Sequence, residues 1–356
     1  MVFPKTLPPH VLLWWGISLR KLLHRRRICS AQGMNTHPEV SVVMSVYNDA
    51  FCLAKTLDSI LSQEGVEFEF IVVNDGSTDK SSQILTEYAQ PDSRLRIIHQ
   101  ENTGLTRALI RGCDSARGEF IARQDAGDIS LPGRLARQRV ILDAEPAGVL
   151  VSCATRFVGP SDEELYTVAQ SSEELEEGLR QLTIEKVHGP SCHPSVMFRR
   201  STYEQVGGYR AVFPVAQDLD LWMRISEVGR CFAMPEVLYQ VTLAPGSISA
   251  TRRDEQLRAT HSILACAAAR RAGKSEAEAL SRWQSELVGL QARMRSTDRE
   301  RARFYYFIAR TLRKHRPDLS RLYYWKSIRS WMLYPRAWAG LITDIFFLIR
   351  ARSSGS

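Results

Sequence analysis

The sequence has no apolar run long enough to cross a bilayer and no cysteine pair at CxxC spacing. Its longest apolar stretches, residues 11–19 and 337–349, fall short of the roughly 20 residues that a spanning helix needs. The seven cysteines are odd in number and widely scattered, which argues against a zinc site or a disulfide framework and favours a reducing compartment. No GxGxxG motif follows the first predicted strand, so a dinucleotide-dependent oxidoreductase is not favoured.

Acidic residues are absent from residues 1–33, which hold six lysines and arginines around the apolar run Val11–Trp15. This composition predicts a basic helix lying in a membrane interface. The alternative is that translation begins at Met34 and that the preceding residues are disordered. No small-residue cleavage site follows the apolar run, which argues against a secretory signal.

The whole chain is basic, with a formal net charge of +8 over 356 residues. Such a charge favours an anionic partner, which could be nucleic acid, an anionic lipid surface or a phosphorylated substrate. No nucleic-acid recognition motif is visible and the positive charge concentrates near the two ends, so we expect no nucleic-acid partner. Hydrophobic residues make up 44% and charged residues 24%, as in an ordinary globular protein.

Short β-branched runs alternate with helix-period segments between Val40 and Phe157, which predicts an α/β fold with a doubly wound, mainly parallel sheet. The predicted strands are 40–46, 68–73, 95–99, 119–123, 149–157 and 237–243, and the predicted helices include 52–63 and 104–116. From about residue 250 the pattern is helical. We therefore predict a catalytic domain over 34–250 and a helical C-terminal region over 251–356.

Polar residues follow two of the predicted strands, where ligands of open parallel sheets bind. Ser45 and Tyr47 end the first strand, and the tyrosine ring offers a face on which a nucleobase can stack, although such a residue is often only packing. Asp75 begins the turn Asp75–Asp79, in which Gly76 supplies an unusual φ and Ser77 or Thr78 caps the next helix. A sharper hypothesis is that Asp75 accepts a hydrogen bond from a nucleobase imide.

Asp125 and Asp128 come just after an apolar strand. Mg²⁺ and Mn²⁺ prefer oxygen ligands and commonly use one or two carboxylates together with substrate phosphates. The pair therefore predicts a metal site beside a diphosphate leaving group. The alternative is that Asp128 caps the helix that follows Leu131-Pro132.

Asp218 lies in the first turn of a predicted helix whose apolar face holds Leu221, Trp222 and Ile225. The helix dipole favours negative charge there, so capping is one explanation. The other is catalysis, because a carboxylate can accept the proton of an acceptor hydroxyl. His193 stands beside a predicted strand and is a further candidate, although a lone histidine is more often structural.

Together and in this order, these segments resemble the family 2 glycosyltransferases of the GT-A fold, of the type that builds bacterial cell-surface polysaccharides. The resemblance covers Val40 to Leu243 and rests on VSVVMSVYN, VVNDGSTD, ENTGLTRALIRGCDSARGEFIARQDAGD, ISLPGRLARQ, HPSVMFRR and QDLDLWMRI. Each motif is weak alone, but the ordered set is specific. It implies a nucleoside diphosphate sugar bound across the strand ends, Mn²⁺ or Mg²⁺ near a DxD-type motif, and transfer with inversion to a glycan or lipid-linked acceptor.

The resemblance also implies roles for individual residues. Asp218 is the expected general base, and His193 and Arg224 are expected on the acceptor or diphosphate side. The metal is expected at Asp125 and Asp128. The nucleotide contacts are expected at Ser45, Tyr47, Asp75, Arg107 and Asp125.

Two positions depart from the family pattern. At the position of Gly127, relatives commonly have the acidic residue that is most often assigned as a direct metal ligand. In this chain the metal would therefore be bound by Asp125, Asp128 or water, or metal dependence would be weaker. Gln217 stands where relatives often have Glu, and a neutral neighbour should lower the pKa of Asp218 relative to a Glu-paired case. Gly127 also leaves open a catalytically impaired nucleotide-sugar-binding or scaffolding protein of the same fold.

Residues 326–350 combine Trp331, Trp338, Phe346 and Phe347 with flanking arginines. Aromatic anchors with cations are typical of a helix lying on a membrane surface, so we predict peripheral contact with the inner face of the plasma membrane from the cytoplasm. The alternative is that this helix packs on the catalytic domain.

Overall fold

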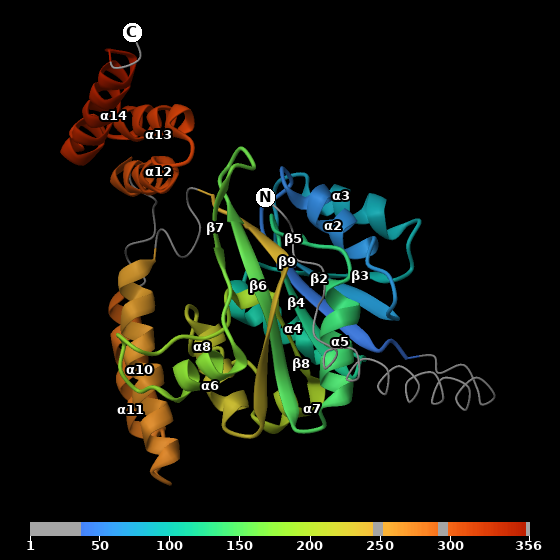
Figure 1. Ribbon diagram of the computed structural model, residues 1–356. Coiled ribbons are helices and arrows are strands. Elements are labelled where there is room, and N and C mark those ends of the chain that lie inside the picture. The colour runs from blue at the N-terminus through green and yellow to red at the C-terminus, as the bar shows by residue number, and fades with distance from the viewer. Residues whose placement is uncertain (1–36, 245–251, 291–297, 354–356) are drawn as a thin grey trace, which may run out of the picture. The chain divides into compact units, whose positions relative to one another are not determined.

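The computed structural model describes residues 37–244, 252–290 and 298–353 (Figure 1). The predicted N-terminal segment 1–33 and the predicted boundary near residue 250 lie outside these residues. The described strands form one nine-stranded mixed sheet. Within the described part of the chain, no helix combines the length and the apolar character needed to cross a membrane.

The first half of the sheet is parallel and wound as the sequence predicts. Strands β1, β2, β3 and β4 pair in the order β3-β2-β1-β4. Strands β1, β2 and β4 are almost wholly buried, whereas β3, at the edge of the sheet, is mostly half-buried. The elements are β1 (Val40–Val46), α2 (Leu53–Leu61), β2 (Phe68–Asp75), α3 (Ser81–Ala89), β3 (Leu95–Gln100), α4 (Leu105–Asp114) and β4 (Phe120–Asp125).

The second half of the sheet mixes directions. Strand β8 is antiparallel to both β4 and β6, while β9 runs parallel to β6 and pairs with the short β5. The elements are β5 (Ile129–Ser130), α5 (Arg134–Ala144), β6 (Gly148–Val158), β7 (Glu164–Val168), α6 (Ser172–Arg180), η1 (His193–Ser195), β8 (Val196–Arg199), α7 (Arg200–Gln205), α8 (Gln217–Ser226) and β9 (Arg230–Thr242).

Strand β9 begins well before the start predicted from the sequence. We expected a strand only after Pro235, since proline donates no ladder hydrogen bond. The strand instead continues through Pro235, because the pairing with β6 shifts there: Met234 pairs with Cys153 and Val237 with Ala154. Pro235 lies in this bulge and has no paired residue on β6, so its lack of an N–H group removes no hydrogen bond of the ladder.

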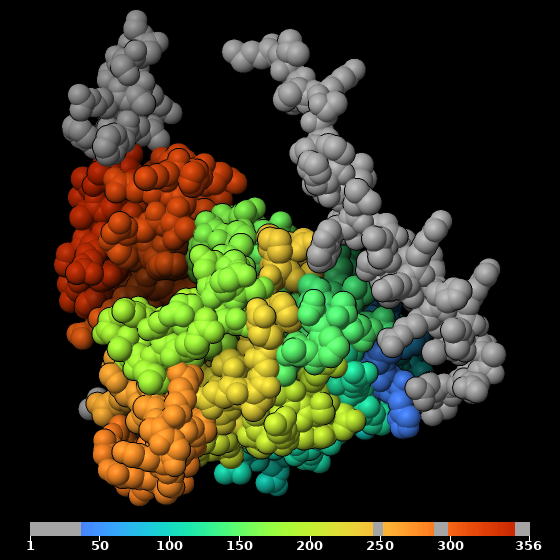
Figure 2. All heavy atoms as spheres, turned by 60° about the horizontal axis from the view of Figure 1, so that its bottom comes forward, coloured from blue at the N-terminus to red at the C-terminus, as the bar shows by residue number. Residues whose placement is uncertain are grey.

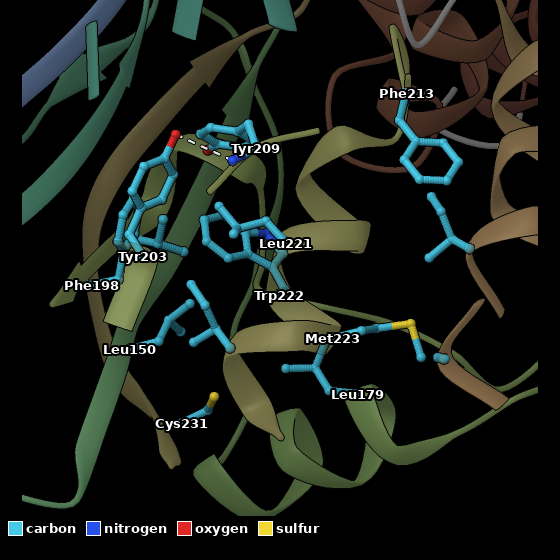
Figure 3. Packing of buried hydrophobic residues seen from close by; sticks show 14 of the residues in the cluster. Leu150, Leu179, Phe198, Tyr203, Tyr209, Phe213, Leu221, Trp222, Met223 and Cys231 are labelled. Carbon is cyan, nitrogen blue, oxygen red and sulfur yellow. Dashed lines mark hydrogen bonds between the residues drawn. The ribbon is translucent and has the colours of Figure 1, made fainter. Parts of the chain in front are cut away.

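Each face of the sheet carries its own apolar core. One core joins α2 and α5 to the sheet, and the other joins α4, α6 and α8. Figure 3 shows the second core around Trp222 of α8, with Leu221 and Met223 beside it and the rings of Phe198, Tyr203 and Tyr209 nearby. This packing fixes α8, and therefore its first turn, against the sheet.

The predicted C-terminal helical region contains two packing units. Helices α10 (Arg253–Arg271) and α11 (Ala277–Leu290) join the core around α8, where the buried Trp283 donates a hydrogen bond to the carbonyl of Val212 at 2.7 Å. Helices α12 (Asp298–Leu312), α13 (Pro317–Ser330) and α14 (Pro335–Ser353) have a core of their own. The predicted surface helix 326–350 is thus the end of α13, a turn and most of α14.

Candidate active site

The carboxyl ends of β1, β2 and β4 lie at one edge of the sheet. Ser45 pairs in register with Val73 on β2 and with Asp125 on β4. Asp75 lies two residues beyond Val73, so its Cα is roughly 12 Å from that of Asp125 by strand geometry. Tyr47 follows β1 and is 54% exposed, as a ring available to a ligand must be.

Asp75 is held by the start of α4. Its carboxylate accepts hydrogen bonds from the backbone N–H groups of Thr103 and Gly104, both at 2.9 Å, and from Gln100 at 2.7 Å. It is only 2% exposed. These contacts give Asp75 a structural role in orienting α4, and any contact with a nucleobase would be additional to it.

The turn after Asp75 differs in part from the prediction. Gly76 has the predicted positive φ, 73°. Ser77 and Thr78 do not cap the next helix: the Ser77 hydroxyl accepts from the backbone N–H of Asn48, and the Thr78 N–H donates to the Asn48 side chain. The turn therefore ties the ends of β1 and β2 together.

Arg123, which the sequence motifs did not single out, connects the acidic residues. It is fully buried on β4 and forms an ion pair with Asp125 at 2.7 Å. Its Nε lies 3.4 Å from Nε2 of His193. The only sequence signal was a charged residue inside an apolar strand.

Asp128 is buried and anchors β9. Its carboxylate accepts hydrogen bonds from the backbone N–H of Thr242 at 3.1 Å and from the Tyr239 hydroxyl at 3.3 Å. Burial, followed by the negative charge of Asp125, raises the pKa of Asp128 well above its usual value. The capping hypothesis is wrong, because α5 begins at Arg134 with Gly133 at its N-cap.

Gly127 adopts a φ of 88°, a conformation that glycine tolerates best. A Cβ at this position would lie 3.5 Å from Oδ2 of Asp49, so a second carboxylate stands next to the place of the missing acid. Burial, and then the charge of Asp79, raises the pKa of Asp49 to about 6. Asp49 was not predicted, because nothing in the sequence links it to residue 127.

Asp218 begins α8 as predicted and is partly exposed. Burial raises its pKa, backbone N–H groups of its own turn lower it, the charge of Asp125 raises it, and Arg123 lowers it; the net shift is upward. Among the described side chains none donates a hydrogen bond to this carboxylate. Asp218 is thus a partly exposed carboxylate within electrostatic reach of Asp125 and Arg123.

His193 lies among aromatic rings. Its Nε2 is 2.8 Å from the Tyr209 hydroxyl, and its ring makes an edge contact with Trp222 at 5.9 Å between centroids. Burial and the nearby positive charge of Arg123 lower the pKa of His193 well below its usual value. The histidine is therefore neutral at physiological pH, and it links β8 to the residues around Asp218.

Arg224 has a structural role in these contacts. Its guanidinium is buried and donates to the carbonyls of Val206 and Gly208 and to Asp220. Asp220 is also paired with Arg210. This placement gives no support to the predicted role of Arg224 on the acceptor or diphosphate side. Arg107, the predicted nucleotide contact, is exposed on the first turn of α4 and is free to meet a ligand.

The described residues offer carboxylate oxygens for a divalent metal, but these oxygens do not form one cluster around a single point. Among the described residues, no group of three or more His, Cys, Asp or Glu side chains is close enough to hold an ion. Asp125 and Asp49 offer carboxylates, whereas both Asp128 oxygens already accept protein hydrogen bonds. Such a set fits a metal that takes most of its ligands from substrate phosphates and water.

Comparison with known proteins gives the family. A family model described as Glycosyl transferase family 2 matches residues 41–207. EpsE of Bacillus subtilis, named as a glycosyltransferase, is 34% identical over 223 residues, which are 58% of this chain and 74% of EpsE. EpsH of the same organism is 34% identical over 185 residues, 51% of this chain and 52% of EpsH.

Two solved structures share the fold. S. aureus TarS residues 1–349 in complex with UDP-GlcNAc has a TM-score of 0.52 at 17% identity, and its complex with UDP has a TM-score of 0.51 at 16% identity. Each likeness covers 89% of this chain and 92% of the solved TarS chain of residues 1–349. The mixed sheet, the ordered motifs at its edge and the match to EpsE show that this chain is a glycosyltransferase of family 2 with the GT-A fold.

Proposed function

We propose that this glycosyltransferase moves a sugar from a nucleoside diphosphate sugar to a hydroxyl of a glycan or lipid-linked acceptor, with inversion and with Asp218 as general base. The observation that carries the proposal is the placement of Asp218. It is a partly exposed carboxylate without a side-chain partner among the described residues, at a helix start held by a buried core, beside Asp125 and Arg123.

In the proposed reaction the acceptor oxygen attacks the anomeric carbon on the face opposite the diphosphate. The bond from that carbon to the diphosphate oxygen breaks, and Asp218 takes the proton of the attacking hydroxyl. The raised pKa of Asp218 makes it a stronger base than an ordinary aspartate. We assign the neutral His193, whose ring is hydrogen-bonded to the buried Tyr209, to orienting the acceptor rather than carrying charge.

For the donor, we assign the nucleoside to the edge formed by Ser45, Tyr47 and Asp75, with Arg107 and Asp125 on its diphosphate side. Support comes from the shared register of β1, β2 and β4 and from the exposed Tyr47 ring. The TarS complexes with UDP and UDP-GlcNAc make a uridine donor the first to test.

Mn²⁺ or Mg²⁺ would be held by Asp125 with Asp49 beside Gly127, and would neutralise charge on the leaving diphosphate. Asp128 is less suited, because its carboxyl is buried and anchored to β9. We expect weaker metal dependence than in relatives that have an acid at position 127.

The proposal is tested with Asp218→Asn in a donor-to-acceptor transfer assay. Loss of the base should lower turnover by about 10² to 10⁴, while donor binding stays the same. Asp254→Asn is the matched control, because Asp254 is an exposed aspartate in the first turn of α10. Near-normal turnover of folded Asp218→Asn would refute the assignment.

The alternative of a catalytically impaired binding protein is motivated by Gly127. It predicts that the wild-type chain binds the nucleotide sugar but neither transfers nor hydrolyses it in the presence of Mn²⁺. The same assay therefore separates the two functions.

A further inference from the structure

The last two helices expose apolar side chains that their own core does not use. Helices α13 and α14 pack through buried residues such as Tyr324, Ile328 and Leu341. Figure 2 shows the side chains of α12 to α14, in red, packed together. On their outer sides lie large exposed apolar residues, which we name the hairpin face: Leu322, Trp325, Met332, Leu333, Trp338 and Ile342.

The hairpin face is continuous across the two helices. Leu322 and Trp325 are three residues apart on α13, and Trp338 and Ile342 are four apart on α14, so each pair lies on one side of its helix. The rings of Trp325 and Trp338 meet edge to face at 5.9 Å between centroids, which brings the two sides together. The turn between the helices carries the most exposed members, Met332 at 72% and Leu333 at 77%.

Cations without counter-ions flank this turn. Arg329, at the end of α13, and Arg336, at the start of α14, are exposed, and neither forms an ion pair with another described residue. The acidic residues of α13 and α14 already form ion pairs with other arginines. Asp318 pairs with Arg316, and the buried Asp344 pairs with Arg313. The hairpin face is therefore apolar at its centre and positive at its rim.

We propose that the hairpin face docks this enzyme on an anionic lipid bilayer, with Met332 and Leu333 inserted below the headgroups. Exposed apolar tips and paired tryptophans suit the interface, and free arginines suit anionic headgroups. A protein partner would need no such pair of unpaired arginines beside the apolar tip, so charge complementarity favours lipid. The hairpin face overlaps the segment 326–350 predicted from the sequence, but Trp331, expected as an anchor, is partly covered by Tyr334 and Arg299. The side chains of Phe346 and Phe347 lie outside the part of the chain that the structure describes.

Docking by the hairpin face is independent of the transfer chemistry. It needs neither donor nor acceptor, so it is measured on the whole chain without substrates. Its failure would leave the proposed transferase reaction untouched, and the failure of that reaction would leave the docking surface untouched.

The test is flotation of the full-length chain with vesicles of equal parts phosphatidylcholine and phosphatidylglycerol, compared with pure phosphatidylcholine. We expect binding to the anionic vesicles only. The double variant Met332→Ser/Leu333→Ser should lose at least about tenfold in partitioning. Arg329→Gln/Arg336→Gln should lose about fivefold per arginine, and wild-type binding should weaken with salt.

The control is Leu182→Ser/Leu257→Ser, which removes two exposed leucines from elsewhere on the surface. It should bind as the wild type does, and thermal melting should confirm that all variants are folded. Equal binding of wild type and hairpin variants would overturn the proposal, as would equal binding to both vesicle types. A wild-type dimer that becomes a monomer in Met332→Ser/Leu333→Ser, with vesicle binding unchanged, would assign the face to a second copy instead.

Discussion

Arg123 organises the charge of the site at the scale of single residues. It is a fully buried cation that pairs with Asp125, approaches His193 and lowers the pKa of Asp218. The charge of Asp125 acts on Asp218 in the opposite direction. Burial is the main cause of the raised pKa of Asp218, and these two neighbours on β4 adjust that pKa in opposite directions. A charge added near the start of α8 should therefore change it measurably.

Gln217→Glu is predicted to move the pH dependence of transfer. The new carboxylate adds a like charge next to Asp218 and raises its pKa further, so the acidic limb of kcat/KM should move up by about one pH unit. The measurement is a pH profile beside Gln90→Glu, an exposed control at the C-terminal end of α3. An unchanged acidic limb of the pH profile would mean that the ionisation of Asp218 does not control kcat/KM.

Asp49→Asn is predicted to stabilise the protein above neutral pH. The folded-state pKa of Asp49, about 6, is above the ordinary value of 3.8, so ionisation costs stability as pH rises from 3.8 to about 6, and the cost stays constant at higher pH. Allowing for its partial exposure, the gain should be about 1 kcal/mol at pH 8 and absent at pH 4. Urea unfolding at both values measures it, and an equal effect at both would contradict the assigned pKa.

The residues of the site were only partly predictable. Tyr47, Asp75, Asp125, Asp128 and Asp218 come from motifs that the structure places as expected along the chain, although the ligand roles of these residues stay predictions. Arg123, Asp49 and Tyr239 were not predicted, because their partners are 70 or more residues away or lie across a turn. Burial also changed the interpretation of Arg224 and Asp128, and burial is not visible in a local motif.

At the scale of elements, β9 is tied to the loop after β4. The Tyr239 hydroxyl donates to Asp128 and accepts from the backbone N–H of Asp125, and the Thr242 N–H donates to the same Asp128. These bonds hold the turn containing Gly127 against the sheet. The position of Asp125 therefore depends on a strand more than 100 residues further along the chain.

Tyr239→Phe is predicted to lower the free energy of unfolding by about 1 to 2 kcal/mol, because two buried hydrogen-bonding groups lose a partner. Tyr166→Phe is the control: it removes a hydroxyl from a partly buried tyrosine on β7. Chemical denaturation measures both. A loss no larger than that of the control would mean that the tie is not stabilising.

The elements themselves were largely predictable where the pattern is local. The strands of the parallel half were placed within two residues at each end, because buried apolar runs and polar turns alternate there. The pairing of β8 between β4 and β6, the path of β9 through Pro235 and the break at 331–334 were not predicted. The first two are decided by partner strands remote in the sequence. The break directly precedes Pro335, the first residue of α14, a local signal that the prediction of one helix over 326–350 did not use.

At the scale of the whole molecule, the chain joins a GT-A sheet, two helices that complete its core and a further three-helix unit. In the proposed function the strand ends and α8 supply the groups for transfer, and in the proposed docking the hairpin face contacts lipid.

The central claim, that the strand ends bind a nucleoside diphosphate sugar, is tested most directly by thermal melting with UDP and UDP-sugars, with and without Mn²⁺. A ligand that binds only the folded state raises the melting temperature. We predict a concentration-dependent rise for wild type and a smaller rise for Tyr47→Ala. No rise with uridine, thymidine or guanosine diphosphates or their sugars, or an equal rise in Tyr47→Ala, would contradict the account.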